Sequence, residues 1–236
     1  MARGVLITGG TGSIGSAVTA RFLQDGDAVA VTYRAAAEWE RLRAAHPAPA
    51  ESGQLAGFEA DVTDHDSMRG AVDGAAARLG GLAVLAHIAG GFEGGTPVEH
   101  LSEASVRGMI ELNLLSAFWA AKHAIPHLKR SGGGRLLFVS SRGAVQAQAG
   151  AAPYPASKLG LHALVATLAQ ELKKDGVTAN AVLPSLVDTP QNRAAMPKAD
   201  VATWVRPEQI AALLSYLGSE ASAAVTGALI PIYGKA

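Results

Sequence analysis

Tyr154 and Lys158 lie four residues apart in a stretch with helical character. This spacing places the two side chains on one face of a helix. The lysine ammonium can then stabilise the phenolate and lower a tyrosine pKa that is normally about 10. A tyrosine tuned in this way can exchange a proton with a substrate oxygen near neutral pH. Because such a pair also occurs by chance, its meaning depends on the residues around it.

Ser141 and Asn113 are polar residues that could join this pair. Ser141 follows the predicted strand Arg135–Ser140, and ligands of open α/β sheets bind beyond the carboxyl ends of strands. Its hydroxyl could hydrogen-bond a reacting carbonyl. Ser140 is the competing serine, and alternation along a strand points the two side chains to opposite faces. Asn113 lies in an apolar helical stretch, where its amide needs partners, either a water bound at a kink or a structural contact.

A glycine-rich turn lies between the first predicted strand, Val5–Thr8, and the first predicted helix, Ile14–Gln24. Glycine permits a positive φ and lets the backbone approach a ligand closely. The following helix offers free N–H groups and a positive dipole end to a pyrophosphate. A plain tight turn is the alternative, but strand, turn and helix in this order are typical of a dinucleotide site. The candidate cofactor-binding residues of the turn are Gly9, Thr11, Gly12, Ser13, Ile14 and Gly15.

The end of the second predicted strand indicates which dinucleotide binds. NAD-binding proteins carry an acidic residue there that hydrogen-bonds the ribose 2′-OH, whereas this chain has Arg34. A guanidinium can pair with the 2′-phosphate, so we expect NADP(H) rather than NAD(H). A solvated arginine is the alternative. After the third strand, Asp61 could accept from an adenine amino group and Val62 could pack on the ring, while Asp64 or Asp66 caps the next helix.

Short β-rich runs alternate with longer helical stretches along the whole chain. This alternation predicts an α/β fold, a single Rossmann-type domain over residues 1–236 with a doubly wound parallel sheet of about seven strands and helices on both faces. The predicted strands are Val5–Thr8, Ala28–Tyr33, Gly57–Asp61, Ala83–Ile88, Arg135–Ser140, Thr178–Leu183 and Ala228–Pro231. The predicted helices are Ile14–Gln24, Ser67–Arg78, Ser105–Lys129, Pro155–Lys174 and Pro207–Leu217.

Two segments are predicted as loops. His46–Gly53 is rich in Pro, Ala and Gly, which favours a surface loop before the third strand. Residues 189–207 contain three prolines and little periodicity, and connections of this length are often lids or binding loops. We therefore expect a substrate-binding lid there. Trp204 in this segment could cover a substrate or anchor the lid on the body of the protein.

The composition excludes several classes of function. Basic and acidic side chains number 20 each, so the net charge is zero and neither nucleic-acid nor membrane binding is expected. The chain has no cysteine, which excludes disulfides and cysteine-ligated metals. Its apolar runs are shorter than the roughly 20 residues of a membrane-spanning helix and a signal peptide is lacking, so we expect a soluble cytoplasmic protein. His123 and His127 lack a third ligand, so no metal site is predicted.

Together these motifs resemble the short-chain dehydrogenase/reductase family over essentially the whole chain. The resemblance implies an NAD(P)-dependent oxidoreductase that transfers hydride between nicotinamide and a small carbonyl or alcohol. It also implies a homotetramer or homodimer formed through the helices that bear Asn113 and Tyr154. The motifs that carry it are Thr8-Gly9 through Gly15, Asp61-Val62, Ala89-Gly90, Asn113, Ser141, Tyr154 through Lys158, Asn180 through Pro184, and Thr189.

The resemblance also implies a role for each matching residue. Tyr154 would be the general acid/base, and Ser141 would orient the carbonyl. Lys158 would bind the nicotinamide ribose and tune Tyr154, while Asn113 would hold a water in a proton relay that includes Lys158. Further cofactor-binding positions implied by the family motifs are Ala89, Gly90, Pro184, Val187 and Thr189.

The chain departs from the family pattern at three places. Ser13 stands where the commonest turn has glycine, and Ser185 replaces the usual glycine after Pro184. Ile88 occupies the place of the asparagine in the family's Asn-Ala-Gly, which puts one local hydrogen bond in doubt but not the chemistry.

Two other interpretations remain open. The chain resembles the dihydropteridine reductase branch at Ala89-Gly90-Gly91, Asp188-Thr189-Pro190, Asn192-Arg193, Met196-Pro197 and Trp204. That branch lacks the serine and asparagine of the catalytic set, which are present here as Ser141 and Asn113. A non-catalytic dinucleotide-binding regulator is the second alternative, although binding alone does not require the four residues of that set.

Overall fold

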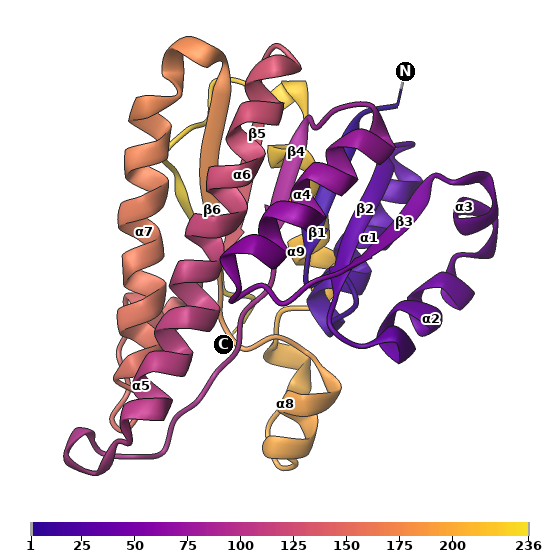
Figure 1. Ribbon diagram of the computed structural model, residues 1–236. Coiled ribbons are helices and arrows are strands. Elements are labelled where there is room, and N and C mark those ends of the chain that lie inside the picture. Colours follow the sequence, from indigo (N-terminus) through magenta and orange to yellow (C-terminus); the bar gives the residue numbers. More distant parts are fainter. Residues whose placement is uncertain (1, 236) are drawn as a thin grey trace.

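The computed structural model describes residues 2–235, which form a single seven-stranded sheet with all strands parallel (Figure 1). The strand order is β3-β2-β1-β4-β5-β6-β7, so the predicted doubly wound parallel sheet is confirmed. The strands are β1 (Gly4–Thr8), β2 (Ala28–Tyr33), β3 (Leu55–Glu59), β4 (Val84–His87), β5 (Gly134–Val139), β6 (Val177–Pro184) and β7 (Leu229–Ile232).

Helices cover both faces of this sheet (Figure 1). α4, α6 and α7 pack on one face and α1 and α9 on the other. The helices are α1 (Ser13–Gln24), α2 (Ala36–Ala45), α3 (Pro47–Ser52), α4 (His65–Leu79), α5 (Glu103–Ile110), α6 (Ser116–Arg130), α7 (Pro153–Glu171), α8 (Pro190–Ala195) and α9 (Pro207–Leu217).

The central strands are largely apolar because each of their faces meets a helix layer. In β1, Leu6 belongs to the core under α4 and α6, whereas Val5 and Ile7 belong to the core under α1 and α9. In β5, Phe138 and Leu137 divide in the same way between the two cores. Side chains that alternate between two buried faces explain why the strands lack an alternation of polar and apolar residues.

The strand order reverses between β1 and β4, and the loops at the carboxyl ends of these strands are where ligands of such sheets bind. The loops after β1, β2, β4, β5 and β6 all leave the sheet at this edge, beside α8 (Figure 1). The fold therefore brings the separate motifs of the sequence to one side of the molecule.

The structure corrects three expectations about helices. The predicted loop His46–Gly53 contains α3, because Pro47 opens a helix and Gly53 ends it in the left-handed conformation at φ 75°. The predicted long loop 189–207 contains α8 and the short 3₁₀ turn η5 (Val201–Thr203). The predicted continuous helix Ser105–Lys129 is instead α5 and α6 joined by the π-helical turn η2 (Glu111–Leu115).

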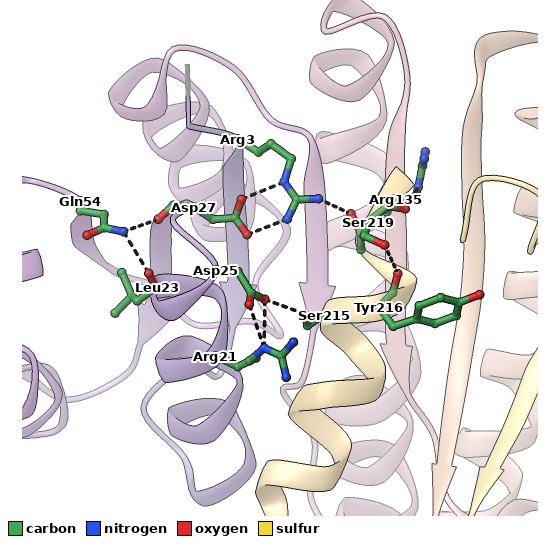
Figure 2. A network of polar contacts seen from close by, with 11 residues as sticks. Arg3, Arg21, Leu23, Asp25, Asp27, Gln54, Arg135, Ser215, Tyr216 and Ser219 are labelled. Carbon is green, nitrogen blue, oxygen red and sulfur yellow. Dashed lines mark hydrogen bonds and ion pairs between the residues drawn. The ribbon is translucent and has the colours of Figure 1, made fainter. Parts of the chain in front are cut away.

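A polar network ties the layers together at the opposite, amino-terminal edge of the sheet (Figure 2). Arg3 donates from Nε and Nη2 to the two carboxylate oxygens of Asp27, each at 2.8 Å, and from Nη1 to the carbonyl of Gly218 at 2.7 Å. Gln54 donates to the carbonyl oxygens of Leu23 and Asp27. These bonds connect β1 with the loops that follow α1 and α9.

Among the helices of residues 2–235, none has the length and apolarity needed to cross a lipid bilayer.

Candidate active site

The glycine-rich turn between β1 and α1 is shaped to hold an anion. Gly9 has φ 67°, a backbone conformation that residues other than glycine rarely adopt. A Cβ atom there would also lie 3.0 Å from the backbone of Ala89. Gly12 is the N-cap of α1 and makes no side-chain hydrogen bond to the helix. The first N–H groups of α1, at Ser13, Ile14 and Gly15, therefore have no intrahelical acceptor and point out of the helix. These residues fit a dinucleotide pyrophosphate.

Arg34 and Asp61 lie close to each other beyond the ends of β2 and β3. Both are exposed, and the Asp61 carboxylate accepts from the N–H and the hydroxyl of Thr63 at 2.9 and 2.7 Å. These bonds, with a smaller contribution from the charge of Arg34, lower the pKa of Asp61. The helix cap is a different residue, since Asp64 accepts from the N–H of Ser67 at 2.6 Å. Asp61 thus stays charged at the carboxyl edge of the sheet.

Thr11 has a partner that the sequence did not predict. Its hydroxyl donates to the carboxylate of Glu38 at 3.3 Å, which brings a negative charge from α2 to the rim of the glycine-rich turn. Glu38 and Arg34 therefore place opposite charges on the strand-β2 side of this site.

Tyr154 lies in the first turn of α7, where its phenol makes a side-chain hydrogen bond with Ser141. Ser141 follows β5, and its hydroxyl oxygen also accepts from the N–H of Gly143 at 3.0 Å. Burial raises the pKa of Tyr154 and outweighs the lowering by Ser141. The expected lowering of this pKa by Lys158 is therefore wrong, because desolvation of the phenolate dominates.

Lys158 lies one helical turn after Tyr154 and is buried. Its Nζ donates to the carbonyl of Val139 at the end of β5, at 2.9 Å. Burial lowers the pKa of Lys158 to about 8. A Cβ atom at Gly90 would lie 3.1 Å from Nζ of Lys158 and 2.7 Å from Oδ1 of Asn113, so the two side chains converge on that glycine.

Asn113 lies in η2 and its amide is paired with the backbone of Gly91. Its Oδ1 accepts from the N–H of Gly91 at 2.9 Å, and its Nδ2 donates to the carbonyl of the same residue at 3.0 Å. Both expectations for this residue are partly met, since the helix is interrupted here and the amide makes a structural contact. The pairing fixes the loop after β4 beside Lys158.

Ser140, the competing serine, and His87, a buried histidine of β4, both bond to groups in the interior of the protein. The hydroxyl of Ser140 bonds the ring of His162 at 2.8 Å and donates to the carbonyl of Lys158 at 3.4 Å, so both of its partners belong to α7. His87 is buried between the hydroxyls of Thr8 and Ser116, at 2.8 and 3.2 Å. Sequence reasoning did not predict that His87 supports the turn η2 that holds Asn113.

The segment after β6 carries the remaining cofactor candidates. Pro184, Val187 and Thr189 are buried, and the hydroxyl of Thr189 caps α8 by accepting from the N–H of Asn192 at 3.2 Å. Trp204 is buried as well, which favours the anchoring role over an exposed cover. A cavity of about 520 Å³ lies beside this segment, with Asp188, Arg193, Trp204, Arg206 and Lys235 among its lining residues.

Comparison with known proteins places these features in a family. The sequence model described as short chain dehydrogenase matches residues 3–200. The 3-oxoacyl-[acyl-carrier-protein] reductase MabA of Mycobacterium tuberculosis is 33% identical, with 99% of this chain and 92% of that protein covered. The acetoacetyl-CoA reductase of Allochromatium vinosum is 31% identical, with 99% and 98% covered.

Solved structures agree with this assignment. A short-chain type dehydrogenase/reductase from Mycobacterium ulcerans superposes with a TM-score of 0.93 at 27% identity, covering 99% of this chain and 89% of that one. A short-chain dehydrogenase/reductase mutant from Serratia marcescens gives a TM-score of 0.90 at 29% identity, covering 99% and 97%.

Proposed function

Because the chain belongs to the short-chain dehydrogenase family, we propose that Tyr154 is the general acid/base of its reaction. The protein is an NAD(P)-dependent oxidoreductase. The observation that carries the proposal is the hydrogen bond between Tyr154 and Ser141, one helical turn from the buried ammonium of Lys158. No role in cofactor binding alone requires this arrangement.

The residues of the glycine-rich turn would hold the pyrophosphate, and those after β4 and β6 would hold the nicotinamide end. The candidates are Gly9 to Gly15, Asp61, Val62, Ala89, Gly90, Pro184, Val187 and Thr189. When bound, the nicotinamide supplies or accepts the hydride. Lys158 would bind the nicotinamide ribose with its ammonium.

The remaining residues act on the proton and on the substrate oxygen. In reduction, Tyr154 donates its proton to the oxygen as the carbonyl becomes a hydroxyl, and its raised pKa keeps the phenol protonated for this step. Ser141 donates a hydrogen bond to the same oxygen and orients it. Asn113 keeps one lone pair of Oδ1 free of the Gly91 contact, and this would hold a water on the path to Lys158.

The central experiment is the substitution Tyr154→Phe, which removes the hydroxyl and keeps the ring. We expect kcat to fall about 10²–10⁴-fold, the usual contribution of positioned proton transfer. Binding of NADPH, followed by its fluorescence, should stay within the wild-type range. Tyr216→Phe is the control, since that tyrosine is exposed on α9. Near-normal turnover by Tyr154→Phe would exclude the proposed mechanism.

We propose NADP(H) as the preferred cofactor on the basis of Arg34, which is exposed beyond β2 and free to meet a 2′-phosphate. Glu38 opposes this preference by bringing a carboxylate to the neighbouring turn. We expect Arg34→Ala to lower kcat/KM with NADPH about tenfold, or about 1.4 kcal/mol, and to leave the value with NADH nearly unchanged. The assignment fails if wild-type enzyme prefers NADH and Arg34→Ala alters neither value.

The substrate is a small carbonyl or alcohol, as the relatives' names, a 3-oxoacyl reductase and an acetoacetyl-CoA reductase, support. Dihydropteridine reductase-like activity is the second candidate, favoured by the motifs of residues 188–197, and an assay with quinonoid dihydropterin distinguishes the two. NADPH binding without turnover of any carbonyl would instead favour a non-catalytic regulator.

We also propose that the protein works in the cytoplasm as a homodimer or homotetramer. Phe118 on α6 and Leu159 on α7 support such an assembly, since these large apolar side chains are 42% and 54% exposed on the outer helices. Residues 189–207 form the proposed substrate-binding lid, with Trp204 as its anchor.

A further inference from the structure

Phe92 lies in the loop after β4, and its ring meets the ring of Tyr154 edge to face. The ring centroids are 5.0 Å apart and the ring planes make an angle of 79°. Phe92 is nevertheless 66% exposed. An exposed phenylalanine is ordinary on a protein surface, but this one presents an open aromatic face directly beside the proposed acid/base.

The loop holds this ring in place. A Cβ atom at Gly94 would lie 2.8 Å from Cζ of Phe92, so the ring rests against the backbone of that glycine. The N–H groups of Gly95 and Thr96 both donate to the carbonyl of Gly150, at 2.8 and 3.0 Å, and fasten the loop to the segment before α7. The loop that carries Phe92 is therefore attached to the segment before α7, with the ring against Gly94.

The charge in this loop is directed away from the ring. The carboxylate of Glu93 accepts from the hydroxyl of Ser105 on α5 at 2.6 Å. On the turn after Ser141, a Cβ atom at Gly143 would lie 3.3 Å from Cε1 of Tyr154, and two residues further Val145 is 53% exposed. Phe92 and Val145 are thus large apolar side chains that are exposed on the two loops next to the phenol.

We propose that Phe92 determines substrate specificity, by packing against an apolar substituent on the carbonyl carbon whose oxygen Tyr154 protonates. The inference rests on the proposed function and narrows its substrate class to ketones and aldehydes with an aryl or branched alkyl group beside the carbonyl. Such a group covers the open face of the Phe92 ring and removes apolar surface from water. A charged group in this position would gain nothing from that face.

The test compares wild-type enzyme with Phe92→Ala and Phe92→Leu on a series of methyl ketones, CH₃–CO–R, in which R is methyl, isopropyl or phenyl. With NADPH in excess, wild-type kcat/KM should rise with the apolar area of R. In Phe92→Ala the value for the phenyl ketone should fall about tenfold, chiefly through KM, and the value for acetone should change little. For Phe92→Leu, the kcat/KM for the phenyl ketone should lie between the values of wild-type enzyme and Phe92→Ala.

Matched controls separate this role from a general structural one. Tyr216→Ala removes an exposed aromatic side chain from α9 and should leave the series unchanged. Phe92→Ala should bind NADPH as the wild type does. An equal loss for every ketone, or an unchanged series, would overturn the role of Phe92. Wild-type enzyme that binds NADPH but reduces no carbonyl of a broad panel would overturn the proposed function itself.

Discussion

Burial moves the pKa values of Tyr154 and Lys158 in directions that oppose their ionisation. The phenolate and the ammonium are the charged forms, and each loses hydration inside the protein. The site therefore places a protonated phenol one helical turn from a lysine whose pKa burial lowers to about 8. A bound substrate oxygen would receive a proton from the phenol rather than meet a phenolate.

The substitution Lys158→Met should stabilise the cofactor-free protein while it abolishes activity. A lysine pKa of about 8 in the folded state and 10.5 in the unfolded state means that folding releases protons between these pH values. The destabilisation is fully present below pH 8 and disappears as the pH rises towards 10.5. We expect the free energy of unfolding of the variant to be about 1–3 kcal/mol higher at pH 7. This figure allows for the loss of the hydrogen bond to Val139, which methionine cannot make.

Urea unfolding at pH 7 and pH 9 without cofactor measures this effect. The stability advantage of Lys158→Met should shrink at the higher pH, because the wild-type lysine is then mostly neutral. Lys174→Met is the control, since Lys174 is exposed. A variant that is less stable than the wild type at pH 7, with the same pH dependence, would contradict the burial argument.

At the scale of elements, the π-helical turn η2 is what allows one long helix to present Asn113. The hydroxyl of Ser116 donates to the carbonyl of Leu112 at 2.6 Å, so it accepts from the ring of His87 rather than donating to it. The other ring nitrogen of His87 then accepts from Thr8 at 2.8 Å. Burial and the charge of Lys158 lower the pKa of His87 to about 3, so the ring stays neutral in this role.

His87→Leu should therefore destabilise the protein by about 1–3 kcal/mol, because the Thr8 hydroxyl loses its acceptor and the Ser116 hydroxyl loses its donor. The loss should be accompanied by faster amide hydrogen exchange in η2, which a simple packing defect in β4 would not require. His100→Leu is the control, since that side chain is 71% exposed. Unchanged stability together with unchanged exchange in η2 would show that the hydrogen-bonded chain is dispensable.

The elements that the sequence predicted best are those with the strongest apolar pattern. The central strands and the helix Pro207–Leu217 were predicted closely, because buried faces leave long apolar runs. The turn η2 is not predictable from the sequence pattern, since a π-helix differs from an α-helix only in which carbonyl each N–H group donates to. Helix α3 was missed because its Pro and Ala content is equally typical of a loop. The contact of Glu38 with Thr11 depends on tertiary placement of α2, which no local pattern encodes.

At the scale of the whole molecule, the two edges of the sheet differ in how their polar groups are paired. The amino-terminal edge carries the paired network of Arg3, Asp27 and Gln54, whose bonds join β1 to the loops after α1 and α9 (Figure 2). The carboxyl edge carries the groups that we propose for ligand binding, namely Arg34, Phe92 and the first N–H groups of α1. Because the two buried cores lie on the faces of the sheet, the loops at its carboxyl edge can vary in shape and chemistry without loss of the fold. Substrate specificity in this chain should therefore follow the loops after β4, β5 and β6, and the sheet itself should tolerate their replacement.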